Sequence, residues 1–153
     1  MTLVIGVGNR WRGDDAAGLV VARRLGGLEH EGDATTLVDA WRAGDDVVIV
    51  DAASSGAPPG TVRRFDALAA PLPAAHLRSS THAFGVPDAV ELARALGRLP
   101  ATLRVIAIEG AGFTAGDRLS DAVAGAVDAV VAELARGAAA HARDASTTSR
   151  NAP

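Results

Sequence analysis

Near its amino terminus the chain reads Leu3-Val4-Ile5-Gly6-Val7-Gly8-Asn9-Arg10-Trp11-Arg12-Gly13-Asp14-Asp15-Ala16-Ala17-Gly18. An apolar run opens this stretch, and a helical pattern over 19–25 follows it and ends at Gly26-Gly27. A strand, a glycine turn and a helix in this order form the corner at which α/β proteins bind ligands. Backbone amides at the start of a helix attract anions, but the adjacent carboxylates of Asp14 and Asp15 repel them. The turn therefore favours a cation.

The rest of the chain continues the alternation of strands and helices. Further strands are predicted at 47–50, 61–65 and 103–108, with a short and weak one within 28–33. Helices are predicted at 36–41, from about 87 to 96, and from 121 to about 136. The charges in 61–65 are typical of an edge strand. This alternation predicts one doubly wound α/β domain over residues 1–136, with a mostly parallel sheet in a three-layer α/β/α arrangement.

The remaining segment, 137–153, consists mainly of Ala, Ser, Thr and Asn and has no apolar face. A terminal segment that buries nothing has no tertiary contact to order it. We therefore expect a disordered carboxyl-terminal tail.

The composition excludes several classes of function. The 153 residues carry a formal net charge of −3, which argues against a nucleic-acid partner. There is no cysteine, so disulfides, thiolate metal sites and a cysteine nucleophile are excluded. No signal peptide is recognisable, and no apolar run approaches the ~20 residues that a membrane helix needs. We expect a cytoplasmic monomer without membrane contact.

Polar residues follow the predicted strands where each of them ends. Asp15 follows the first strand, Asp51 follows 47–50, and Glu109 follows 103–108. His82 precedes the helix that starts near 87, which puts it at the same end of the sheet. Ligands of such sheets bind beyond the carboxyl ends of the strands. Two carboxylates and an imidazole could form an open site for Ni²⁺, Zn²⁺ or Mn²⁺, and the donor types do not choose among these ions.

Each of these residues also has an ordinary structural interpretation. Acids in the first turn of a helix often serve as N-caps or interact with the helix dipole, which applies to Asp14 above all. Asp51 could accept loop amides, Glu109 could pair with an arginine or cap a loop, and a loop histidine such as His82 is usually a surface residue. Trp11, in the glycine turn, is expected to fold back over the edge of the core, with a ligand contact as the alternative.

Other catalytic patterns fit less well. The turn lacks the third glycine of a dinucleotide-binding fingerprint, and its two acids would repel a pyrophosphate. His30-Glu31 begins a zinc-protease pattern, but residue 34 is alanine where the second histidine would stand. The segment 54–56 lacks the nucleophile elbow of serine hydrolases.

Three separated segments occur in an order that is informative. They are Gly6-Val7-Gly8-Asn9 with Gly13-Asp14-Asp15-Ala16-Ala17-Gly18, Val50-Asp51-Ala52 with 55–61, and Ser80-Thr81-His82-Ala83-Phe84-Gly85. Together they resemble the hydrogenase maturation proteases, which are endopeptidases that trim the C-terminus of the large subunit of nickel–iron hydrogenases. The resemblance extends from about residue 3 to residue 135.

The resemblance implies a fold, a site and a partner. It implies a doubly wound α/β fold and a metal-binding set of Asp15, Asp51 and His82, which are also the catalytic residues. Asp14 is then a helix cap. The implied metal is nickel, which the precursor of the hydrogenase large subunit brings with it, and that precursor is the implied partner.

One segment departs from the family pattern. Many relatives carry a D-G-G/T-T-x-G segment that contributes to substrate recognition, whereas this chain has His30-Glu31-Gly32-Asp33-Ala34-Thr35 in a shortened region, 26–36. Two alternatives therefore remain beside the endopeptidase. One is a non-proteolytic module of the same fold that binds metal or precursor, and the other is an α/β protein that binds a nucleotide or another anion.

Overall fold

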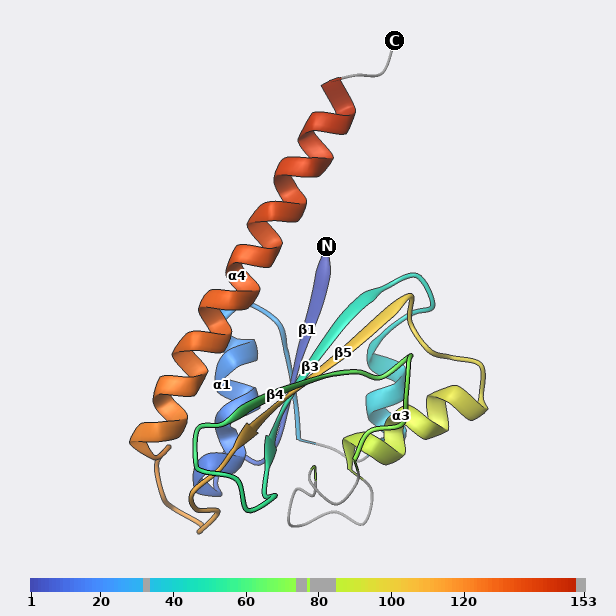
Figure 1. Ribbon diagram of the computed structural model, residues 1–153. Coiled ribbons are helices and arrows are strands. Elements are labelled where there is room, and N and C mark those ends of the chain that lie inside the picture. Colours follow the sequence, from blue (N-terminus) through green and yellow to red (C-terminus); the bar gives the residue numbers. More distant parts are fainter. Residues whose placement is uncertain (32–33, 74–76, 78–84, 151–153) are drawn as a thin grey trace.

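The computed structural model describes residues 1–31, 34–73, 77 and 85–150 (Figure 1). Its strands form one sheet in the order β2-β1-β3-β5-β4. The strands are β1 (Thr2–Val7), β2 (Leu28–His30), β3 (Asp46–Ala53), β4 (Val62–Asp66) and β5 (Thr102–Glu109). Neighbouring strands run parallel except for β4, which pairs antiparallel with β5 at the edge of the sheet. The mostly parallel sheet and the charged edge strand are confirmed.

Helices cover both faces of the sheet and complete the three layers (Figure 1). One face carries α1 (Ala17–Arg24) and α4 (Asp121–Arg150), and the other carries α2 (Ala34–Leu37), the 3₁₀ turn η2 (Val38–Ala40) and α3 (Val86–Ala95). The predicted helix at 36–41 corresponds to α2 with η2. The doubly wound α/β/α architecture is therefore confirmed.

Strand β3 shows why the sheet was recognisable from the sequence. Val47 and Ile49 belong to the core beneath α3, whereas Val48 and Val50 belong to the core beneath α1 and α4. All four side chains are fully buried. A strand that helices cover on both faces must be apolar at every position, and this produces an uninterrupted apolar run.

The start of α1 lies unusually close to the sheet. A Cβ atom at Gly18 would lie 2.1 Å from the backbone oxygen of Val50, and one at Gly6 would lie 2.0 Å from the oxygen of Gly18. At both positions a Cβ atom would overlap a backbone oxygen, so only glycine, which has no Cβ atom, fits there. The two glycines therefore bring the turn that carries Asp15 against the ends of β1 and β3.

Helix α4 corrects the prediction for the carboxyl terminus. It was expected to end near Arg136 and to be followed by a disordered segment, 137–153, but it continues to Arg150, and 151–153 lie outside the described residues. The alanine-rich composition explains the difference, because alanine has the highest helix propensity and needs no tertiary contact to favour a helix. The helix extends well beyond the layers of the domain (Figure 1).

Two further element boundaries differ from the prediction. Strand β3 extends to Ala53, so Asp51 lies within the strand and not after it. A 3₁₀ turn, η1 (Gly13–Ala16), precedes α1 and contains both acids of the first turn. Within residues 1–31, 34–73 and 85–150, no helix combines the length and the apolar character that crossing a membrane requires.

Candidate functional site

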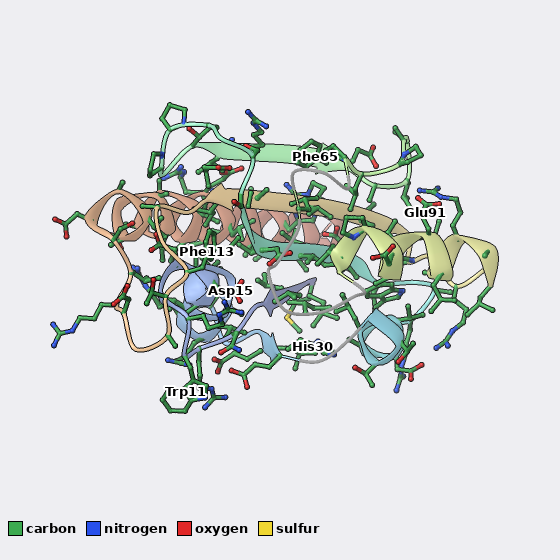
Figure 2. All side chains as sticks on the ribbon, turned by 90° about the horizontal axis from the view of Figure 1, so that it is seen from below. Trp11, Asp15, His30, Phe65, Glu91 and Phe113 are labelled. Atoms are coloured by element: carbon green, nitrogen blue, oxygen red, sulfur yellow. The ribbon has the colours of Figure 1, made fainter. Side chains whose placement is uncertain are left out.

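Asp15 and Asp51 lie together at the carboxyl edge of the sheet, which Figure 2 views from below. Asp15 comes from η1 and Asp51 from β3, and each is only 1% exposed. A Cβ atom at Gly8, just past β1, would lie 1.9 Å from the backbone oxygen of Asp15 and 3.7 Å from its Oδ1. The glycine therefore leaves room for Asp15 to sit directly over the end of β1.

The two carboxylates influence each other electrostatically. Burial raises the pKa of Asp51 well above its usual value, and the negative charge of Asp15 raises it further. The backbone amide of Ala52 donates to Asp51 Oδ1 at 2.8 Å and opposes this effect. Two buried like charges are costly, and a proton or a cation between them relieves the cost.

The donor set suits a divalent cation. Carboxylate oxygens bind hard and borderline ions, and a pair of them supplies half of a tetrahedral site. Within the described part of the chain, no group of three or more His, Cys, Asp or Glu side chains gathers to hold a metal. His82, the third predicted ligand, lies outside the described residues. The structure thus brings together Asp15 and Asp51, and the place of His82 stays a prediction.

Asp14 has a different role from the helix cap that the sequence predicted, because the hydrogen bonds of its carboxylate go to another part of the chain. Its carboxylate accepts hydrogen bonds from the amides of Ala111 (2.7 Å), Gly112 (3.1 Å) and Ser120 (2.7 Å), and from the Ser120 hydroxyl (2.9 Å). These donors lie in the connection from β5 to α4. Because they are about a hundred residues away along the chain, no local pattern could reveal them.

Glu109 also has a structural role. Its carboxylate accepts hydrogen bonds from the amide and hydroxyl of Ser55 and from the amide of Gly56, at 2.7, 2.8 and 3.1 Å. The interpretation of Glu109 as a loop cap is confirmed. It holds the loop after β3 and leaves Asp15 and Asp51 as the buried acids of the candidate site.

Trp11 does not fold back over the core, as the sequence analysis expected. Its side chain is 70% exposed and points away from the sheet (Figure 2). The expectation is wrong because the backbone of the turn is held by hydrogen bonds that leave the indole outside: the amide of Trp11 donates to Asn9, and its carbonyl accepts from Gly116.

His30 is a residue at this edge that the sequence analysis did not assign to the site. It ends β2 and pairs with Val7, and its carbonyl accepts a hydrogen bond from the amide of Gly8 at 3.2 Å. Its Nε2 lies 3.1 Å from the hydroxyl of Thr36. The register between β1 and β2 places His30 here, and a strand of three residues was too short to establish that register from the sequence.

Comparisons with known proteins point to one group. The family model described as hydrogenase maturation protease matches residues 32–136, which are 105 of the 153 residues. The NiFe hydrogenase maturation protease HybD from Thermococcus kodakarensis is similar in structure, with a TM-score of 0.66 and 26% identity over 89% of this chain and 97% of that chain. No curated protein sequence matches this chain significantly.

Two proteins from Escherichia coli have the same fold. An endopeptidase gives a TM-score of 0.74 at 21% identity, with 87% of this chain and 88% of that chain covered. The hydrogenase maturating endopeptidase HybD gives a TM-score of 0.69, also at 21% identity, with the same coverage of 87% and 88%.

Proposed function

The chain belongs to the hydrogenase maturation protease family, and on this premise we propose that it removes a C-terminal peptide from the nickel-loaded precursor of a nickel–iron hydrogenase large subunit. The observation that carries the proposal is the pair of buried, adjacent carboxylates, Asp15 and Asp51, at the carboxyl edge of the sheet. A pair of this kind is a poor site for an anion and a good one for a divalent cation.

In this proposal the nickel ion arrives as part of the substrate. Asp15 and Asp51 supply oxygen ligands, and His82 supplies the imidazole that completes the set. A bound divalent cation provides Lewis-acid charge next to the peptide bond that is cut. Burial and the charge of Asp15 raise the pKa of Asp51, and a divalent cation that displaces the proton relieves both effects, so the site favours a precursor that carries its metal.

The fixed backbone around the site supports this function. The Asp14 carboxylate ties the turn of Asp15 to the loop after β5, and Glu109 ties the loop after β3. Side chains held in this way need little reorganisation when the substrate binds, which favours precise positioning of the scissile bond.

We propose further that the chain acts as a monomer in the cytoplasm. Few large hydrophobic side chains are exposed, and among the described residues these are Met1, Trp11, Leu28 and Leu96. The absence of cysteine is compatible with a reducing compartment. Sedimentation equilibrium should give the mass of a single chain.

A specific observation favours one alternative, a module that binds the precursor without cutting it. The region between α1 and β3 is short, β2 has only three residues, and the family-model match begins at residue 32, after β2. This is the region in which relatives carry their substrate-recognition segment. A module with altered recognition would still bind the metal-loaded precursor through Asp15 and Asp51 but would not cleave it.

Co-expression with a large-subunit precursor tests the proposal and separates it from the alternative. Mass spectrometry should show a shortened large subunit with the wild-type chain and a nickel supply, and the unprocessed precursor with Asp15→Asn, Asp51→Asn or His82→Ala. Asp39→Asn is the matched control, because Asp39 is exposed and pairs only with Arg98 in the described structure. Nickel-free precursor should stay uncut.

Each outcome decides between the candidates. Stable association with the nickel-loaded precursor without cleavage would support the binding module. Processing that is unchanged in all three variants would overturn the assignment of the site, and the absence of both binding and cleavage would overturn the proposed function.

A further inference from the structure

Trp11 lies in the turn that leads to Asp15, four residues before it, and its indole is exposed. The chain has two tryptophans, of which Trp41 is 4% exposed and Trp11 is 70% exposed. Trp41 is held in the core, and its indole N–H donates to the carbonyl of Arg98 at 2.9 Å. Trp11 instead presents a large apolar surface to water, which is unfavourable unless another molecule covers it in some state of the protein.

The segment that carries this indole, residues 8–13, is fixed on both sides. The Trp11 amide donates to Asn9 Oδ1 at 2.9 Å, and its carbonyl accepts from the Gly116 amide at 2.8 Å. Arg10 pairs with Glu31 at 2.8 Å. Among the described residues, the hydrogen bonds of Trp11 use only its backbone, so folding of the turn does not require the indole.

The short distance along the chain between Trp11 and Asp15 indicates which molecule could cover the indole. Trp11 precedes Asp15 by four residues, which span at most about 14 Å when fully extended. The bond from the Asp15 amide to the Arg12 carbonyl, at 3.1 Å, shortens this distance. A typical protein interface covers about 800 Å² on each partner, which corresponds to a disc of roughly 16 Å radius. An interface of this size that is centred on Asp15 and Asp51 therefore extends as far as residue 11.

We propose that Trp11 is a docking and specificity residue for the hydrogenase large-subunit precursor, which buries the indole in an apolar patch of its own surface. The proposal rests on the proposed function and adds a recognition residue to it. Tryptophan is enriched among residues that dominate binding energy, and a preorganised backbone lowers the entropy cost of using it. Arg10 and Glu31, half-exposed and paired, form the polar rim beside it.

Steady-state processing of purified nickel-loaded precursor by the full chain tests the role. Trp11→Ala should raise KM by roughly 10- to 30-fold, the range expected for loss of a binding hot spot, with kcat changed less than about twofold. Trp11→Phe should recover most of the loss. Leu96→Ala is the matched control. Leu96 is also exposed (56%), but it lies after α3 on the side of the amino end of β5, away from the candidate site. The KM of the Leu96→Ala variant should equal that of the wild-type chain.

A second measurement reports contact directly. The chain labelled with 5-fluorotryptophan has two ¹⁹F resonances, one from Trp11 and one from Trp41, which Trp11→Phe assigns. Unlabelled precursor should shift or broaden the Trp11 resonance and leave that of Trp41 unchanged. Far-UV circular dichroism verifies that Trp11→Ala is folded.

The outcomes separate this inference from the proposed function. If the wild-type chain processes the precursor while Trp11→Ala keeps the wild-type KM, or while saturating precursor leaves the Trp11 resonance unmoved, the docking role is overturned and the proposed function stands. If the wild-type chain neither binds nor processes the precursor, both fail together.

Discussion

At the scale of single residues, Asp14 and Asp15 show how adjacent, equally buried side chains take different roles. Both are 1% exposed. Asp14 turns toward the loop after β5 and the start of α4, where it meets four donor contacts. Asp15 turns toward the end of β1 and the carboxylate of Asp51. One acid thus holds the local structure, and the other belongs to the candidate site.

Asp51 should lower the stability of the metal-free protein at neutral pH. Its folded-state pKa is raised, so the contribution of Asp51 to stability is greatest below the unfolded pKa of about 3.9 and falls as pH rises toward the folded value. We expect Asp51→Asn to melt a few degrees higher than wild type at pH 7 in EDTA, with the difference disappearing near pH 4. Thermal unfolding monitored by circular dichroism checks this. A lower melting temperature for Asp51→Asn at pH 7 would contradict it.

Asp14, in contrast to Asp51, should increase the stability of the folded protein. Asp14→Ala removes the acceptor of partly buried donors in Ala111, Gly112 and Ser120, and should lower the free energy of unfolding by about 3 kcal/mol. Urea denaturation measures the change. Asp45→Ala is the control, because in the part of the chain that the structure describes the Asp45 carboxylate accepts a hydrogen bond only from the exposed amide of Arg42. This substitution should cost about 1 kcal/mol or less. Equal losses in the two variants would contradict the role assigned to Asp14.

At the scale of elements, the contact between α1 and the sheet sets the position of Asp15. The helix approaches β3 so closely that Gly18 has no space for a side chain, and the turn before it is carried to the ends of β1 and β3. The helix–sheet contact and the site therefore depend on the same glycine.

Two glycine substitutions test this contact. Gly18→Ala should destabilise the protein by at least about 2 kcal/mol, because its Cβ would lie 2.1 Å from the backbone oxygen of Val50. Gly125→Ala, within α4, meets nothing within 4 Å and should stabilise by about 0.5–1 kcal/mol through helix propensity. Urea denaturation of both variants provides the measurement. A neutral Gly18→Ala would show that α1 can move away from the sheet at little cost.

At the scale of the whole molecule, the end of α4 adds no apolar packing to the described cores of the layered domain, although the charge of His141 helps to lower the pKa of Asp46. Leu134 is the last buried residue of α4 among the described residues, and 135–143 are exposed. The part of the helix that extends past the domain adds helical content and contributes no described contact to either core.

Truncation after Arg136 should therefore leave the domain intact. We expect the melting temperature to change by less than about 3 °C, which corresponds to roughly 1 kcal/mol for a domain of this size. Far-UV circular dichroism should show a loss of helical signal, and the rate of precursor processing should stay that of the full chain. A large loss of stability would mean that residues after 136 pack against the domain.

The sequence by itself determined the layered α/β fold, the edge position of β4 and the place of Asp15 and Asp51, the two acids of the candidate site, at the carboxyl edge of the sheet. A strand that is covered on both faces leaves an apolar run in the sequence, and the end of such a run marks the carboxyl edge of the sheet. Asp15 and Asp51 could be placed at this edge from these local patterns, although 36 positions (51 − 15) separate them. The resemblance to the family rests on three short motifs that occur in a fixed order along the chain, and these can be recognised without the tertiary structure.

Only the tertiary structure decided that Asp14 holds the loop after β5 while Asp15 belongs to the candidate site. It also decided the exposure of Trp11 and the position of His30 at the carboxyl edge of the sheet. Each depends on partners that are distant along the chain: Ser120 for Asp14, Gly116 for the backbone of Trp11, and the register with β1 for His30. A hydrogen bond between residues far apart in sequence imposes no periodicity on either segment. Such contacts become visible only when the sheet has brought the segments together.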